Sequence, residues 1–211
     1  MSITVGYTNT PLNHGLVSGD GWLMLDHAGG QRLMLSDGIG HGPKAQAIVQ
    51  RLQQQLSWIH QRSRPPLPLL SCLGELHHTL VAQGPEAQAA VALVDIAANH
   101  MEVSGVCIGN VRVHLISRDG CSSLPSLNGM VGGRMPGKPQ ATGLRAEMEG
   151  WLLMHSDGLA SQAAVRMMQM ALAKPAAMRP TVQSLANELV ETCAQRSDDA
   201  SCAVLQLRAQ R

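Results

Sequence analysis

Short apolar runs of the kind that form β-strands occur in groups along this chain, with helical patterns between the groups. The first two runs, 21–25 and 32–36, are separated by a short glycine-containing connection, which predicts a hairpin. The runs 89–96, 101–108 and 111–117 are separated by turn residues, which predict an antiparallel meander. Because strands and helices are grouped rather than alternating, the pattern favours an α+β fold over a parallel doubly wound sheet.

The other elements are predicted from residue spacing and from helix-breaking residues. One helix is predicted to begin near Pro43, and the proline-rich stretch 63–68 ends it. Further helices are predicted at about 69–81, 161–173 and 181–195, a strand pair at about 144–148 and 150–155, and a last strand at 201–207.

Length, charge and cysteine usage narrow the class of protein. The chain has 211 residues, which fits a single domain spanning 1–211. Its formal net charge of +1 argues against nucleic acid or a membrane surface as partner. No apolar run is long enough to cross a bilayer and the N-terminus lacks a secretory pattern, so we expect a cytoplasmic protein.

The five cysteines include no C-x-x-C pair, so they do not indicate a zinc site. The oligomeric state stays open.

Aspartates stand at the ends of the predicted strands. Asp20 comes directly before the first strand, and Asp37 comes directly after the second. In an antiparallel hairpin these ends lie at the same edge, so we expect the two carboxylates to be neighbours, offset by about one residue of register. Later in the chain Asp157 follows a strand, and Asp198 and Asp199 precede the last one. If those two strands are antiparallel neighbours, their acidic ends also meet.

Carboxylates gathered at one edge repel each other, by roughly 4 kcal/mol for a pair about 4 Å apart at an effective dielectric of about 20. A cation relieves this repulsion, and ligands that are all oxygen favour Mg²⁺ or Mn²⁺ over Zn²⁺. Gly38 has no side chain, so its carbonyl is free to turn toward an ion. Two ions about 4 Å apart would activate a shared water for attack on phosphorus. Because Asp-Gly after a strand is also an ordinary turn, the pattern alone leaves both interpretations open.

The amino-acid sequences of these segments also resemble known motifs. Residues 37–42 read DGIGHG, and along the chain stand SGD at 18–20, GNVR at 109–112, SDGL at 156–159 and SDDAS at 197–201. In this order they resemble the motifs of the type 2C metal-dependent protein phosphatases, in the stage-II-sporulation-E-like branch. The length resembles that of the stand-alone stressosome phosphatases (RsbX-like) in this branch.

The resemblance implies a four-layer αββα sandwich, two antiparallel sheets flanked by helices, with two Mn²⁺ or Mg²⁺ ions at one edge. By motif position Asp37 would bridge both ions, and the Gly38 carbonyl would bind one of them. Asp157 would bind one ion and Asp198 the other, with Asp20 bound directly or through water.

The remaining residues near these motifs have less defined roles. A ligand role is less expected for Asp199 than for its neighbours. His41 joins Asp37 as a candidate catalytic residue, because an imidazole can give a proton to the leaving group; capping of the following helix is its alternative role. The glycine-rich segment 128–140, which carries Arg134 and Lys138, is either a substrate-facing flap or a plain connecting loop.

The implied activity is that of a protein serine/threonine phosphatase in signal transduction or stress response, which hydrolyses phosphoserine or phosphothreonine with metal-activated water. The implied partner is a small phosphorylated regulatory protein of the STAS-domain or stressosome type. Two alternatives remain: a catalytically weak regulatory module that binds a phosphorylated partner, and a phosphohydrolase for small metabolites. An open rim would favour a protein substrate, and a deep cavity would favour a metabolite.

Overall fold

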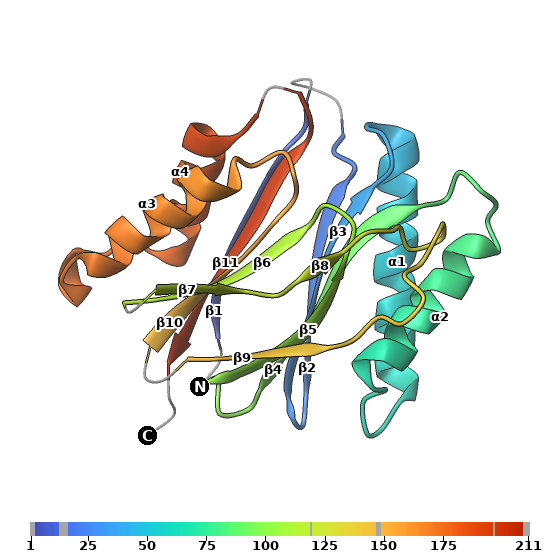
Figure 1. Ribbon diagram of the computed structural model, residues 1–211, viewed down its shortest axis with the longest axis horizontal. Helices are drawn as coiled ribbons and strands as arrows, with labels where there is room; N and C mark the ends of the chain where they lie inside the picture. The colour runs from blue at the N-terminus through green and yellow to red at the C-terminus, as the bar shows by residue number, and fades with distance from the viewer. Residues whose placement is uncertain (1–2, 13–16, 119, 147–148, 196, 209–211) are drawn as a thin grey trace.

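The protein folds into two β-sheets that pack face to face, with helices on both outer sides (Figure 1). The computed structural model describes residues 3–12, 17–118, 120–146, 149–195 and 197–208. Within these ranges, sheet A has the strand order β1 (Thr4–Thr10), β11 (Ala200–Arg208), β10 (Glu149–His155), β6 (Arg112–Ser117) and β7 (Gly120–Ser123). Sheet B has the order β2 (Asp20–His27), β3 (Gly30–Gly38), β4 (Ala89–Ala97), β5 (Glu102–Ile108) and β8 (Ser126–Leu127), and β9 (Thr142–Arg145) pairs with β5.

The helices cover the outer faces of the two sheets. The helices are α1 (Pro43–Arg62) and α2 (Leu69–Val81) on sheet B, α3 (Ser161–Ala173) and α4 (Val182–Cys193) on sheet A, and the short 3-10 helix η1 (Ala176–Met178) between α3 and α4. The predicted αββα sandwich is confirmed, and apart from the short parallel pair β5–β8 its strand pairs are antiparallel in the described residues. None of the helices in the described ranges is long and apolar enough to span a membrane.

Two of the predicted strand pairings are wrong. The third strand of the expected meander, β6, pairs with β10 and β7 in sheet A and not with β5. The chain crosses between the sheets at Gly109, where a φ of 89° favours glycine. The predicted strand at about 144–148 corresponds to β9, which pairs with β5 and not with β10. Positions 147–148 of the predicted range lie outside the described residues. A turn signal marks the end of a strand, but it does not say which sheet the next strand joins.

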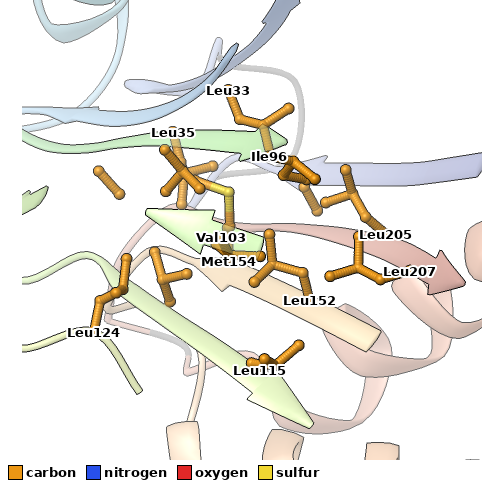
Figure 2. Close-up of a cluster of buried hydrophobic side chains, with 14 of the residues drawn as sticks. Leu33, Leu35, Ile96, Val103, Leu115, Leu124, Leu152, Met154, Leu205 and Leu207 are labelled. Carbon is orange, nitrogen blue, oxygen red and sulfur yellow. The ribbon is translucent and has the colours of Figure 1, made fainter. Parts of the chain in front are cut away.

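The core between the sheets is formed by alternate residues of facing strands. Figure 2 shows Leu33 and Leu35 of β3 in one cluster with Leu152 and Met154 of β10. Met34, between the two leucines, belongs instead to the cluster beneath α1 and α2. The central strands are therefore buried on both faces, which explains why their sequences are continuous apolar runs. Each fully buried side chain of this kind adds about 2 kcal/mol of hydrophobic stabilisation, so the sandwich holds the strand ends firmly in place.

Helix α4 packs so closely on β1 that Gly6 has no room for a side chain. A Cβ at Gly6 would lie 2.4 Å from backbone atoms of Val182 and Gln183. We expect Gly6→Ala to lower the free energy of unfolding by about 1–3 kcal/mol through overpacking, as measured by urea denaturation. Gly74→Ala is the control, because a Cβ in that part of α2 meets no atom within 4 Å. An unchanged free energy of unfolding in Gly6→Ala would contradict the close packing.

Candidate metal centre

The register of the first hairpin places two carboxylates side by side. Asp20 at the start of β2 pairs directly with Asp37 near the end of β3, so the predicted proximity is confirmed without the expected offset. The backbone beyond the pair is tied together, because Gly38 N donates to the Gly19 carbonyl at 3.0 Å. Gly38 also lies against α1, where an added Cβ would be 2.6 Å from the Ala45 carbonyl oxygen. These contacts fix the turn that leads from Asp37 into α1.

The second acidic group lies at the matching ends of β10 and β11, which are antiparallel neighbours, so the condition for their acidic ends to meet is fulfilled. Ser156 N donates to the Ser201 carbonyl at 3.1 Å, so pairing continues just past the end of β10. Asp157 follows in the turn, and Asp198 lies just before β11 on the neighbouring strand connection. A Cβ at Gly158 would lie 1.9 Å from the Asp199 carbonyl oxygen, so only glycine allows this approach of the two segments.

Electrostatic coupling shows that the two acidic groups share one edge of the sandwich. Burial, followed by the charges of Asp20, Asp157 and Asp198, raises the pKa of Asp37 to about 8. Asp37 therefore lies within electrostatic reach of carboxylates next to strands of both sheets. Their charges disfavour ionisation of Asp37, which is an arrangement that a multivalent cation stabilises.

Asp20 is one of the two buried aspartates at this edge, together with Asp199. Burial raises the pKa of Asp20 to about 7, and the nearby Ser156 and Ser201 hydroxyls offset only part of this effect. Both Asp20 carboxylate oxygens are inaccessible to solvent and accept no hydrogen bond of normal geometry. A buried carboxylate without partners is costly, so the site has a physical need for a cation or for protons.

The donor set fits a hard divalent ion. Asp20 offers two unpartnered buried oxygens, and Asp157 Oδ1 is a third. Among the described residues, however, no three His, Cys, Asp or Glu side chains are arranged as a ready metal cage. Binding an ion would therefore require the carboxylates to move closer together.

His41 lies beside this group on the exposed turn that precedes α1. Burial and the neighbouring carboxylates raise the pKa of Asp198. The charge of His41 lowers it by a smaller amount. The imidazole is therefore close enough to Asp198 to act at the same edge. Helix α1 has no side-chain cap among its described contacts, so the structure does not support the capping alternative for His41.

Asp199 uses both carboxylate oxygens within the protein. Its Oδ1 accepts from Leu12 N at 2.7 Å and its Oδ2 from Gly19 N at 2.6 Å. These charge-assisted bonds tie the segment before β2 to the start of β11, and so they hold Asp20 in place. This structural role agrees with the expectation that Asp199 is a less suitable ligand than its neighbours.

One residue of the site is missing from the sequence prediction. Asn110 Nδ2 donates to Asp157 Oδ2, which links the turn between the two sheets to the acidic edge. The sequence offers Gly109 and Asn110 as a turn within the GNVR motif at 109–112 but gives Asn110 no role at the site, because the contact depends on β6 pairing with β10 and that pairing was not predicted.

The glycine-rich segment lies next to the same edge. Val131 forms an isolated bridge with Ala89, and Ala89 is the β4 partner of Gly38. The segment is further anchored to α2, because Gly132 N donates to His77 Nδ1 at 3.0 Å. This position places the loop beside the site but does not decide between a flap and a connection.

The sequence profile described as Stage II sporulation protein E (SpoIIE) matches residues 27–208. The chain belongs to the SpoIIE family. The matched region contains Asp37, Asp157 and Asp198, and Asp20 lies just before it. A search of curated protein sequences found no match.

Solved structures share the fold of this SpoIIE-family chain over nearly its whole length. RsbX in complex with magnesium has a TM-score of 0.73 and 17% identity, covering 97% of this chain and 99% of that one. The phosphatase (PP2C) domain with a regulatory fragment of SpoIIE from Bacillus subtilis has a TM-score of 0.80 and 18% identity, covering 98% and 64%. The catalytic domain of the serine/threonine phosphatase PstP with two manganese ions has a TM-score of 0.71 and 17% identity, covering 98% of each chain. The fold is therefore that of the type 2C phosphatases.

The raised carboxylate pKa values predict how stability depends on pH when metal is removed. Asp20 and Asp37 have ordinary pKa values of 3.8 and folded values of about 7 and about 8. These two carboxyls make the folded state bind more protons than the unfolded state, which lowers stability as pH rises, whereas His114 and His155, whose pKa values are lowered by burial, oppose this effect below their ordinary pKa of 6.5. We therefore expect the melting temperature in EDTA to fall between about pH 6.5 and about pH 8.5, and Asp37→Asn to flatten this fall. A melting temperature that rises or stays level over this range in the wild type would contradict the buried, unpartnered carboxylates.

Proposed function

We propose that this SpoIIE-family chain is a metal-dependent protein serine/threonine phosphatase that hydrolyses phosphoserine or phosphothreonine on a regulatory protein. The observation that carries the proposal is the meeting of carboxylates from both sheets around Asp37. A protein without metal chemistry has no physical reason to bury these repelling groups without partners.

The acidic residues at this edge would share the binding of two metal ions. Asp37 would contact two Mn²⁺ or Mg²⁺ ions, and the Gly38 carbonyl would bind one of them. Asp157 would bind one ion and Asp198 the other. Asp20 would bind directly or through water. When bound, such a pair of ions supplies a nucleophilic water at neutral pH and neutralises the phosphate charge. The metals named with RsbX and PstP support this choice of ions.

His41 is the proposed proton donor to the leaving oxygen of serine or threonine. Its side chain is exposed at the rim, where a bound phosphoester would reach it, and it lies close to Asp198. A general acid matters most when the leaving group is a poor one, such as a serine alkoxide.

The shape of the surface supports a protein as substrate rather than a metabolite. Cavities of 510, 500, 380 and 260 Å³ occur in the protein, and none of these four is lined by an acidic residue of the site. The acidic residues lie instead at an edge beside exposed Ile39 and the glycine-rich segment with exposed Arg134 and Lys138. Exposed residues next to the acidic edge would suit contact with a phosphorylated segment on another protein, and a STAS-domain phosphoprotein is our proposed substrate class.

The first test measures hydrolysis of an aryl phosphate as a function of Mn²⁺ concentration. We expect metal-dependent turnover in the wild type and a loss of at least about 100-fold in Asp37→Asn, because a ligand shared by both ions is removed. Asp26→Asn, an exposed substitution at the opposite end of the same hairpin, is the matched control and should retain activity. Folded wild-type protein that shows no turnover at any Mn²⁺ concentration would favour the regulatory-module alternative.

The second test compares two substrates in His41→Ala. We expect the kcat of this variant to fall by about 100-fold or more with a phosphoserine protein, because the serine oxygen must be protonated as it leaves. Turnover of nitrophenyl phosphate should change much less, because its leaving group is stable without a proton. Equal losses with both substrates would remove His41 from the role of general acid.

A further inference from the structure

We propose that Asn110 is a positioning residue for the metal centre: its amide group holds Asp157 so that one carboxylate oxygen faces the ions. The inference rests on the proposed function, because it concerns the same edge. Asn110 Nδ2 donates to Asp157 Oδ2, whereas Asp157 Oδ1 is buried and has no hydrogen-bond partner among the residues that the structure describes. The hydrogen bond thus occupies one oxygen and leaves the other available as a ligand.

The sheet register explains why these two residues meet. Arg112 of β6 pairs with His155 of the antiparallel strand β10. Counting two residues outward from this pair reaches Asn110 on one strand and Asp157 on the other. Their side chains therefore lie opposite each other just beyond the last paired residues, where an amide can reach a carboxylate.

The turn that carries Asn110 is held rigidly. Arg112 Nη1 donates to the carbonyls of Gly109 at 3.2 Å and Val111 at 3.0 Å. Gly109 N donates to the Leu127 carbonyl at 2.9 Å, and the Ser126 hydroxyl donates to the Gly109 carbonyl. A Cβ at Gly109 would lie 2.6 Å from the Ala90 side chain, so the turn is also closely packed. A donor on so constrained a backbone can fix the rotamer of its acceptor.

No other contact described for Asp157 restrains the rotation of its carboxylate group. Gln195 Nε2 donates to the backbone carbonyl of Asp157 at 3.3 Å, and this bond leaves the carboxylate free to rotate. The neutral amide of Asn110 also adds no negative charge at an edge where Asp37 already has a raised pKa. An amide is therefore suited to this position in a way that a further carboxylate is not, because it orients Asp157 without adding repulsion.

The test measures Mn²⁺ affinity directly, by electron paramagnetic resonance of free Mn²⁺ and by the Mn²⁺-induced rise in melting temperature. We expect Asn110→Ala to bind Mn²⁺ about 10–100-fold more weakly, as is usual when a hydrogen-bond partner of a metal ligand is removed. The kcat for aryl phosphate at saturating Mn²⁺ should fall by a smaller factor. Unchanged Mn²⁺ affinity in folded Asn110→Ala would overturn the inference.

Asn99→Ala is the matched control. Asn99 also lies in a turn that follows a strand of sheet B, where its Oδ1 accepts from Met101 N at 2.9 Å and Glu102 N at 3.3 Å. This variant should lose some stability and keep its Mn²⁺ affinity. Should Asn110→Ala fail to fold, Asn110→Ser provides the same comparison, because serine keeps a polar turn residue but is too short to reach Asp157. An equal loss of affinity in Asn99→Ala and the Asn110 variant would also overturn the inference.

A double-mutant cycle separates positioning from direct ligation. In the Asp157→Ala background the ion assigned to Asp198 remains measurable, and there Asn110→Ala should have no further effect on Mn²⁺ affinity. A further loss in that background would mean that Asn110 binds an ion itself, and the positioning role would be wrong. If the wild type binds no Mn²⁺, or Asp157→Ala loses all binding, the two-ion site of the proposed function fails and this inference fails with it. If the wild type and Asp157→Ala both bind Mn²⁺ but Asn110→Ala binds as tightly as the wild type, only this inference fails.

Discussion

Strand register gathers negative charge at one edge of this protein, and the rest of the site depends on it. Asp20 and Asp37 are directly paired across β2 and β3, and the ends of β10 and β11 bring Asp157 and Asp198 to the same edge. A slip of one residue in either strand pair would turn every buried side chain to the opposite face. The sandwich core prevents this, because Leu33, Leu35 and their partners fit only one register. Hydrophobic packing thus holds in place a charge arrangement that is itself unfavourable without a cation.

Some polar atoms of the acidic edge form hydrogen bonds that hold the fold together, and others are left available to bind a metal ion. Both carboxylate oxygens of Asp199 accept hydrogen bonds, from the backbone N–H groups of Leu12 and Gly19. The side-chain amide of Asn110 donates to Asp157. Asp20 and the second oxygen of Asp157 have no partner inside the protein. This division distinguishes two neighbouring aspartates that look alike in the sequence: Asp199 bonds to distant backbone N–H groups through both oxygens, whereas Asp198 accepts from the adjacent Asp199 N at 2.8 Å through Oδ1. The unsatisfied oxygens are the ones that a hard cation would use.

The surroundings of the site agree with reaction at an exposed phosphoester. The turn through Gly38 and His41 leads directly into α1, and the glycine-rich segment is anchored both to the Ala89 position of β4 and to His77 of α2. The residues next to the carboxylates therefore connect to the helical layer over sheet B. A phosphoprotein docking at this edge would contact elements from both layers, whereas the described cavities lie elsewhere.

The sequence by itself determined the helices and most of the strands, the layered α+β class, and the acidic residues proposed for the site, but it did not indicate β1, β7 or β8. Local signals suffice for these, because apolar spacing reports which face is buried, and small residues beside aspartate mark strand ends. The sequence could not determine which sheet β6 and β9 join, because turn residues carry no information about a strand's distant partner. The tertiary structure alone decided that Asn110 meets Asp157 and that Asp199 ties down the segment before β2. Both contacts join residues far apart in the chain, and they exist because strand pairing within sheet A places β6 beside β10 and β1 beside β11.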